Sequence, residues 1–250
     1  MNYFEKLYNQ KINFIDSGIN SGQYNMDFDT QWANEVENQN KSALFRLYEW
    51  DPWCLSLGYN QKTDDIELEA LKKNGYDIVK RPTGGRAVFH ANELTYSFII
   101  KLENENNEKL SIHQIYRDIH LFFIKSFSRI GIELDFIKAG TNLREFYQLE
   151  GISNSCFASS ARYEVSRAGK KVVGSAQRVI GKTLLQHGSI LVGPEHLQIV
   201  DLLKNKSEDK RIRLLEFIKS KSISLKELSN SKLNIANVKE SIKQEFNSLA

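Results

Sequence analysis

Residues 80–100 of the chain read KRPTGGRAVFHANELTYSFII, with strand-like apolar residues on both sides of Gly84-Gly85. Glycine adopts positive φ without steric cost, and its missing Cβ lets another group approach the backbone N–H groups. The stretch therefore predicts two strands joined by a Gly-Gly hairpin turn. Its bared backbone can serve as one wall of a ligand site.

Strand patterns continue on both sides of this stretch. Alternating or continuous apolar residues bounded by turn residues predict strands. In the first half they occur at KINFIDSG (11–18), ALFRLYEW (43–50), CLSLGY (54–59), YDIVKR (76–81), AVFH (87–90), LTYSFII (94–100) and IELDFI (132–137). Residues 163–192 predict three further strands, with turns near Gly169-Lys170 and Gly181-Lys182.

Helical patterns separate these strands. We expect helices at 22–38 and 64–73, and a longer one from Ile112, where apolar residues recur at helical spacing up to Ile130. Pro194 opens another helix, and the remainder is helical, with a capping box in SLKE (224–227). Without alternating βαβ units, this order predicts an α+β fold with a mixed, largely antiparallel sheet flanked by helices.

Composition limits the class of protein. The chain has 250 residues, 41% of them hydrophobic, enough for one domain with a core at about 12–203. It has two cysteines, no apolar run long enough for a membrane span and no secretory signal pattern, which favours a reduced cytoplasmic protein. We expect a monomer, because nothing in the pattern requires a second copy.

The basic residues are unevenly distributed. Residues 201–250 contain 11 Lys and Arg against 7 acids, although the whole chain has a net charge of only +3. This helical extension (204–250) is either a solvated face or a docking surface for an acidic partner. Because no nucleic-acid-binding motif accompanies the charge, we do not expect nucleic acid as a partner.

Two groups of residues can carry chemistry. Arg81, Arg86 and His90 lie beside the exposed backbone donors of the Gly-Gly turn, a combination that suits a carboxylate, phosphate or thioester carbonyl. The second group is Cys156, Lys171 and the small residues that follow in GKKVVGSAQ (169–177). Taken singly, each of these features has a purely structural explanation. Cys156 can be a buried thiol, Lys171 a solvated lysine, and the run of small residues a barrel corner. Cys54 lies in an apolar strand pattern and is expected in the core.

Several ordered motifs together carry a resemblance to a known family. LYEWDPWCLSLGYNQ, KRPTGGRAVFHANELTYSFII, CFASSARYEV and GKKVVGSAQRVIGKTLLQHGSILV resemble the biotin/lipoate protein ligase superfamily. Within it they are most similar to the cysteine-dependent octanoyltransferases of bacterial lipoate synthesis. The chain departs from the ATP-dependent ligases by having Arg86 where they have a third glycine, and by having Cys156. It departs from the transferases at Ser159 and Ser160, near which a proline is common.

The resemblance implies a site. Cys156 is the acyl-accepting nucleophile and Lys171 the lysine that acts with it. The acyl chain lies beside the Gly-Gly turn. The substrate-binding residues implied are Arg81, Thr83, Gly84, Gly85, Arg86, His90, Gly174, Ser175, Ala176, Gln177, His187 and Gly188. An ammonium near a thiol lowers its pKa from about 8.5 toward neutrality, which favours the nucleophilic thiolate.

The reaction implied is transfer of octanoate from acyl carrier protein, through a cysteine thioester, to a lysine of a lipoyl domain such as the glycine cleavage H protein. A thioester is already activated, so neither ATP nor a metal or other cofactor is expected. Three alternatives remain: an ATP-dependent lipoate or octanoate ligase, an amidotransferase between lipoyl domains, and a non-catalytic acyl- or biotin-responsive regulator. The missing N-terminal DNA-binding segment disfavours the regulator.

Overall fold

The computed structural model describes residues 1–38, 40–104, 106, 108–138, 163–204, 207–229 and 232–248. Its strands form two sheets. The large sheet consists, in spatial order, of β1 (Ile12–Asn20), β2 (Ala43–Trp50), β6 (Glu93–Lys101), β10 (Thr183–Leu191), β9 (Lys170–Ile180), β8 (Tyr163–Arg167) and β7 (Asp135–Lys138). The small sheet consists of β4 (Asp77–Lys80), β3 (Cys54–Leu57) and β5 (Val88–His90).

Both sheets are mixed. In the large sheet only β1 and β2 run parallel among the described strand pairs, and the other pairs are antiparallel. In the small sheet β3 is parallel to β4 and antiparallel to β5. The predicted α+β class, with a largely antiparallel sheet and flanking helices, is confirmed.

The expectation that βαβ units are absent is wrong at two places. Helix α2 (Gly22–Glu37) connects the parallel strands β1 and β2, and α3 (Leu68–Asn74) connects the parallel strands β3 and β4. Parallel neighbours need a crossover connection, and a helix is the usual one. Helix α3 also begins at Leu68 rather than near residue 64, because Ile66 forms a bridge with Leu203 instead.

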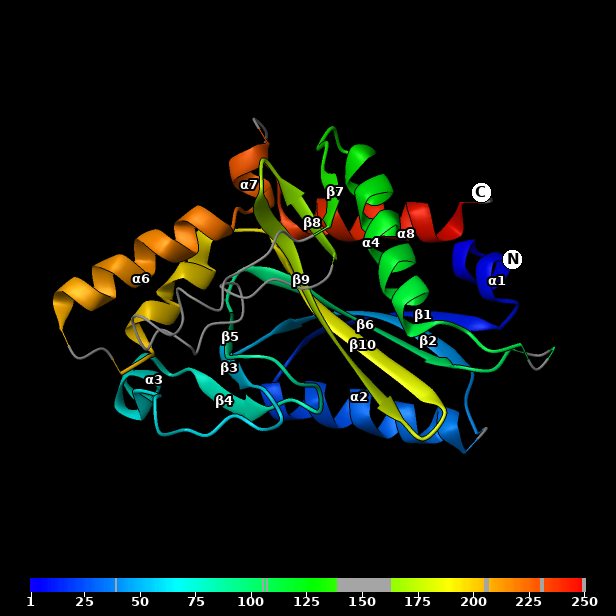
Figure 1. Ribbon diagram of the computed structural model, residues 1–250, viewed down its shortest axis with the longest axis horizontal. Helices are drawn as coiled ribbons and strands as arrows, with labels where there is room; N and C mark the ends of the chain where they lie inside the picture. Colours follow the sequence, from blue (N-terminus) through cyan, green and yellow to red (C-terminus); the bar gives the residue numbers. More distant parts are fainter. Residues whose placement is uncertain are drawn as a thin grey trace.

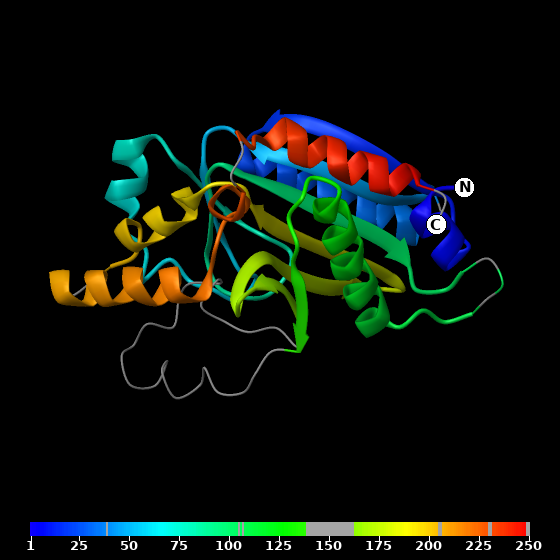
Figure 2. The ribbon, with the colours of Figure 1, turned by 90° about the horizontal axis from the view of Figure 1, so that it is seen from above.

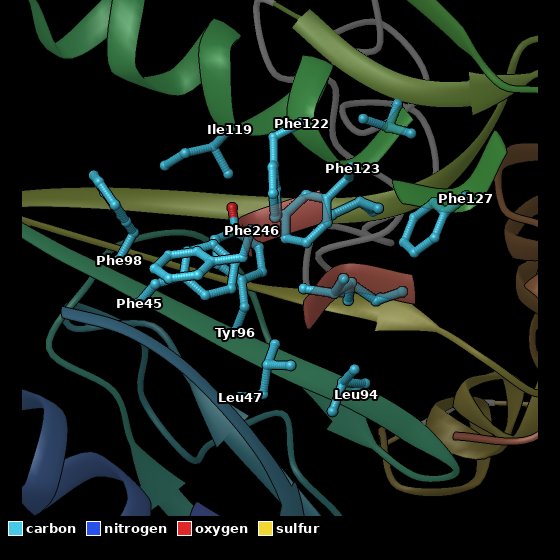
Figure 3. Close-up of a cluster of buried hydrophobic side chains, with 14 of the residues drawn as sticks. Phe45, Leu47, Leu94, Tyr96, Phe98, Ile119, Phe122, Phe123, Phe127 and Phe246 are labelled. Atoms are coloured by element: carbon cyan, nitrogen blue, oxygen red, sulfur yellow. The ribbon is translucent and has the colours of Figure 1, made fainter. Parts of the chain in front are cut away.

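Helices cover both faces of the large sheet (Figures 1 and 2). Helix α2 packs on one face, where Ala33 and Val36 meet strand residues. The other face packs against α1 (Tyr3–Tyr8), α4 (Ile112–Ser128) and α8 (Ile235–Asn247). Figure 3 shows part of this main core, in which the labelled aromatic rings come from β2, β6, α4 and α8 and pack together. At about 1.5–3 kcal/mol for each fully buried side chain, these rings contribute much of the hydrophobic stabilisation.

The basic C-terminal region is helical in its described part, but it is not an extension outside the core, because Val238, Ile242 and Phe246 of α8 belong to the main core. Pro194 opens a 3₁₀ helix, η2 (Pro194–Asp201), rather than the expected α-helix. Helices α6 (Glu208–Lys221) and α7 (Leu225–Leu228) follow, and the predicted capping box of Ser224 and Glu227 begins α7. The last helix, α8, places Phe246 in the main core. No helix among the described residues is long and apolar enough to cross a membrane.

Candidate active site

The Gly-Gly segment is not a hairpin turn, so that prediction is wrong. It connects β4 to β5, which do not pair with each other but lie on opposite sides of β3. The chain from 81 to 87 must therefore cross the end of β3. Gly58 follows β3 at this crossing, and a Cβ on Gly58 would overlap the carbonyl oxygen of Gly85. Gly85 has φ +93°, a conformation that favours glycine.

Arg81 holds this crossing loop in place. Its guanidinium is buried and donates to the carbonyl oxygens of Gly84 (2.9 Å), Arg86 (2.6 Å) and Ser56 (2.9 Å). These contacts fix the backbone of the loop. A Cβ on Gly84 would meet no atom within 4 Å, so this part of the loop faces open space. The bared backbone that the sequence predicted is therefore present on a loop of a different kind.

One buried carboxylate reaches the loop through a histidine. Asp29 of α2 lies 3.7 Å from His187 Nδ1 on β10, and His187 Nε2 is 2.5 Å from Thr83 Oγ1. Both oxygens of Asp29 are also matched by other groups. Oδ1 accepts from Arg46 Nη1 (2.8 Å), and Oδ2 accepts from the Tyr48 hydroxyl (3.0 Å). We call this group the Asp29 cluster.

The Asp29 cluster stays ionised despite full burial. Burial by itself would raise the pKa of the Asp29 carboxyl, but the neighbouring His187 and the charge of Arg46 outweigh it and hold the pKa below its usual value. Burial also lowers the pKa of His187, although Asp29 opposes that shift. The cluster therefore places the ion pair of Asp29 and Arg46 beside His187, which contacts the Gly-Gly loop at Thr83.

A second carboxylate, on β6, reaches the same loop by another route. Glu93 Oε1 accepts from His90 Nδ1 at 2.6 Å, and His90 Nε2 lies 2.7 Å from Ser56 Oγ. Arg81 also donates to that hydroxyl (3.1 Å), so the Ser56 proton can point toward His90. Thr95 donates to Glu93 Oε1 as well. We call Glu93, His90, Ser56, Arg81 and Thr95 the Glu93 cluster.

Glu93 is also ionised, but its hydrogen bonding is incomplete. Burial opposes ionisation, whereas His90, Ser189 and Thr95 together hold the pKa of the carboxyl below its usual value. Oε2 is buried and has no hydrogen bond of good geometry within the described residues. The Glu93 cluster therefore contains one buried carboxylate oxygen without a hydrogen-bond partner among the described residues.

Lys171 lies at the start of β9, where it is 5% exposed. Its carbonyl accepts from the backbone N–H of Ile223, so the segment before α7 holds the strand end. The charge of Lys171 is felt by His120 on α4. Burial is the main cause that lowers the pKa of His120, to about 4, and Lys171 lowers it further. A neutral imidazole thus accompanies this lysine.

A chain of side-chain hydrogen bonds follows β9 away from Lys171. Ser175 Oγ is 3.2 Å from His120 Nε2 and 2.7 Å from the Tyr96 hydroxyl. Gln186 donates to Tyr96, and Gln177 donates to Gln186, both at 2.7 Å. These contacts hold Ser175 and Gln177 on the strand.

The small residues of β9 and β10 face one another across the sheet. Gly174 pairs with Ser189, Ala176 with His187, and Gly188 with Ser175. A Cβ on Gly188 would overlap the carbonyl oxygen of Gly174 and lie 2.8 Å from the Tyr96 ring. Close packing of the two strands therefore requires glycine at 188.

The predicted residues fall into two places on the chain fold. Thr83, Gly84 and Gly85 lie on the crossing loop, where His187 contacts Thr83, and Arg81 fixes the loop backbone at the Gly84 and Arg86 carbonyls. His90 lies at the end of β5 and contacts Ser56 and Glu93 instead. The pairing of β10 with β9 puts Gly174, Ser175, Ala176, Gln177 and Gly188 beside His187 on the sheet.

The two cysteines differ in what the structure says of them. Cys156 lies outside the described residues, and its role stays a prediction. Cys54 is fully buried among Met26, Tyr48, Trp50 and Val79, so the prediction of a core cysteine is confirmed. Burial raises the pKa of its thiol, which makes Cys54 a poor nucleophile.

Sequence reasoning missed several polar residues that support this site. They are Asp29, Arg46, Ser56, Glu93 and His120. Asp29 gave one usable signal, since it follows Asn25 by four residues and precedes Ala33 by four on the buried face of α2. Within the described residues no group of three or more His, Cys, Asp or Glu could hold a metal ion.

Comparison with known proteins identifies the family. The lipoyl protein ligase A/B catalytic domain family matches residues 21–247. Octanoyltransferase LipM of Clostridioides difficile is 35% identical over 90% of this chain and 83% of its own length. The same enzyme of Staphylococcus aureus is 31% identical over 94% and 85%.

Solved structures show the same fold. A bipartite lipoate protein ligase from Thermoplasma acidophilum superposes with a TM-score of 0.69 at 19% identity, covering 94% of this chain and 81% of that one. Lipoate-protein ligase A bound with ATP gives 0.65 at 18% identity, covering 94% and 83%. The chain therefore belongs to the lipoyl protein ligase A/B catalytic domain family, as a member of the octanoyltransferase type.

Proposed function

We propose that this octanoyltransferase takes octanoate from acyl carrier protein and delivers it to a lysine of a lipoyl domain, such as the glycine cleavage H protein, through a thioester on Cys156. The observation that supports the proposal most is the buried Lys171, which lies on β9, the strand that also carries the small residues Gly174, Ser175 and Ala176. The named relatives are octanoyltransferases over nine-tenths of this chain, which favours transfer over ATP-dependent ligation.

The reaction proceeds in two acyl transfers. The Cys156 thiolate attacks the octanoyl thioester, a new C–S bond forms, the C–S bond to the carrier breaks, and the carrier thiolate takes a proton from the Lys171 ammonium. The amine of the acceptor lysine then attacks the acyl-cysteine. A C–N bond forms, the C–S bond breaks to regenerate the Cys156 thiolate, and the proton of the amine passes to Lys171, which gave up a proton in the first transfer. Covalent catalysis thus keeps the acyl group activated while the two carriers exchange.

The Gly-Gly loop suits the acyl group in this scheme. Backbone N–H groups of the bared loop or of the small-residue strand are candidates to stabilise the oxyanion of each tetrahedral intermediate. The octanoyl chain offers six methylenes, each worth about 0.8 kcal/mol when buried. About 5 kcal/mol of gross burial is enough to discriminate chain length.

Intact-mass spectrometry tests the proposal. The protein is incubated with octanoyl-acyl carrier protein in the absence of ATP, and we expect a mass gain of one octanoyl group that hydroxylamine reverses. Cys156→Ala should give no adduct and no transfer. Cys54→Ala is the matched control, because it removes the other thiol, and it should retain the adduct in its folded fraction.

Two lysine variants separate the roles of Lys171. Lys171→Arg keeps a positive charge but cannot act as a base, since the pKa of arginine exceeds 12. It should retain alkylation of Cys156 near neutral pH and fail at transfer to the acceptor. Lys171→Ala should lose both. An ATP-dependent ligase would instead need ATP and free octanoate, and would keep its activity in Cys156→Ala.

A further inference from the structure

Lys171 lies where β9 exchanges one neighbouring segment for another. The pairing of β9 with β10 ends at Val173 and Ile190, two residues away from the lysine. The next neighbour is the segment that leads into α7 (Figure 1), where Ser222 forms a parallel bridge with Lys171 and Ile223 donates its N–H to the Lys171 carbonyl at 3.0 Å. The C-terminal region therefore takes the place of β10 beside the candidate catalytic lysine.

A buried histidine of η2 holds this segment. His196 Nε2 lies 2.8 Å from Ser222 Oγ, and the two residues are 3% and 5% exposed. Ser222 Oγ also donates to the Ile218 carbonyl at 2.9 Å. A hydroxyl has one hydrogen, so the serine oxygen accepts from the histidine, which carries its proton on Nε2 in this arrangement. Because both groups are buried, removing one leaves the other without this partner, and water does not replace it.

The same segment is attached to the end of β10. Lys226 donates its backbone N–H to the Val192 carbonyl at 3.1 Å, so residues 222–226 lie between the start of β9 and the end of β10. On its other side Lys171 pairs with Ser166 of β8. The backbone of the lysine is therefore held from both sides, by β8 on one and by the C-terminal segment on the other.

The place of this backbone decides where the ammonium lies. Lys171 is 5% exposed, so its side chain cannot reorient through solvent as that of a surface lysine does. In a strand the side chain stands out from the sheet in a direction that the backbone sets. A misplacement of about 1 Å at a reacting group costs on the order of 100-fold in rate. A shift of the C-terminal segment should therefore appear in the rate of transfer.

We propose that residues 222–226 position Lys171 for octanoyl transfer, and that His196 holds this segment in place through Ser222. The basic C-terminal region then belongs to the active site and is more than a surface of the molecule. His196 and Ser222 are positioning residues, since they act through the lysine. The inference rests on the proposed role of Lys171 in the reaction.

Amide hydrogen exchange followed by NMR tests the positioning without any acyl chemistry. Ser222→Ala removes the hydroxyl that holds the segment, and the Ile223 N–H should exchange at least about tenfold faster, because its bond to the Lys171 carbonyl opens more often. Amides between β2 and β6 should change far less. Ser126→Ala is the matched control, because Ser126 is a buried serine of α4 that donates to the Phe122 carbonyl at the same 2.9 Å.

Steady-state kinetics test the consequence for the reaction. In Ser222→Ala the kcat per folded molecule should fall at least about tenfold, whereas the KM for the octanoyl donor should stay within about twofold. A displaced lysine acts on the reacting atoms and not on binding of the donor, which is why the two constants should separate. Ser126→Ala should keep both constants.

Two histidine variants keep the experiment decisive if Ser222→Ala folds poorly. His196→Gln keeps an N–H donor near the place of Nε2, whereas His196→Leu removes it. His196→Leu should repeat the effects of Ser222→Ala on the exchange of Ile223 and on kcat, and His196→Gln should retain at least about half of the unmodified kcat. Equal losses in the two variants would overturn the role of His196.

The outcomes separate this inference from the proposed function. Lys171→Ala reports on the lysine alone, and full transfer in that variant would refute its catalytic role and this inference with it. If Lys171→Ala is inactive, the positioning alone is overturned when Ser222→Ala leaves either the exchange of Ile223 or kcat as they are in Ser126→Ala. It is also overturned if the amides between β2 and β6 accelerate as much as Ile223, since the loss is then one of general stability.

Discussion

The Asp29 and Glu93 clusters have the same parts but differ in completeness. In each, a buried carboxylate meets a histidine that contacts a hydroxyl near the Gly-Gly loop, Thr83 in one and Ser56 in the other. Asp29 has Arg46 as a charged partner and both of its oxygens accept hydrogen bonds, whereas Glu93 Oε2 is buried without a hydrogen-bond partner among the described residues. The atom that lacks a hydrogen bond is a ring nitrogen, His187 Nδ1, in the Asp29 cluster and a carboxylate oxygen in the Glu93 cluster, so only the Asp29 cluster has a carboxylate whose two oxygens are both matched.

The largest expected effect comes from replacing each carboxylate by its amide. Asp29→Asn leaves the buried charge of Arg46 uncompensated, and should lower the free energy of unfolding by about 3–5 kcal/mol. Glu93→Gln should cost about 1 kcal/mol, because one of its oxygens already lacks a partner. Urea denaturation of both variants measures the difference. Equal losses would mean that the clusters do not differ in this way.

The next effect concerns a buried histidine with no carboxylate beside it. The pKa of His120 falls from 6.5 to about 4 on folding, so the unfolded chain binds the extra proton first as pH falls. His120 should therefore destabilise the protein progressively from about pH 6.5 to pH 4, by about 3 kcal/mol at the lower limit.

Comparison with a variant isolates this contribution. His120→Gln should flatten the pH dependence of unfolding between pH 6.5 and 4, as measured by urea denaturation at several pH values. Burial also lowers the pKa of His187, but Asp29 opposes that shift. His187 should therefore contribute less than His120 to the pH dependence of stability. An unchanged pH profile in His120→Gln would show that this histidine does not titrate as its environment requires.

A smaller effect is expected at the loop that both clusters support. The Cβ of Gly58→Ala would overlap the Gly85 carbonyl and displace the loop, at about 1–3 kcal/mol of stability and on the order of 100-fold in transfer rate. Gly84→Ala meets no protein atom, so it should fold as the unmodified chain does. If the loop backbone contacts the acyl group, Gly84→Ala should nevertheless lose activity. Full activity in this variant would show that the loop backbone at Gly84 does not contact the substrate.

The smallest effect lies on the surface, away from both clusters. Lys204→Glu with Lys219→Glu reverses two exposed charges of the basic C-terminal region without touching buried groups. The KM for an acidic carrier protein should rise about two- to fivefold at low salt, with stability unchanged. The increase should fade in 1 M salt, where the Debye length is about 3 Å. If the double variant has the same KM as the unmodified protein at low salt, the basic surface does not bind the carrier protein and is only a solvated face.

Local sequence patterns predicted most strands and helices, because alternation and helical spacing record which side of each element is buried. They failed at the Gly-Gly loop. Whether β4 and β5 form a hairpin depends on β3, an earlier segment that lies between them, and no pattern within residues 77–90 contains that information. The two βαβ units were missed for the same reason, since parallel pairing is a property of distant segments.

The candidate site was predicted only in part. Motif residues such as Thr83, His187 and Ser175 were found because their order along the chain resembles a family. Asp29 and Glu93 were not found, because a carboxylate in a sequence looks exposed until its tertiary partners are known. Their burial depends on Arg46 and His90, which come from other elements.

The central pairing of β6 with β10 has a consequence for how quickly the molecule folds. Leu94 pairs with Ile190, whereas Thr183 pairs with Ile180 across a two-residue turn. Closing a loop of about 95 residues costs about 4 kcal/mol of chain entropy, far more than closing the turn. The β9–β10 hairpin should therefore form early and join β6 late. Because His187 comes with the hairpin and Thr83 with the other half, activity should recover in refolding experiments only when this last association is complete.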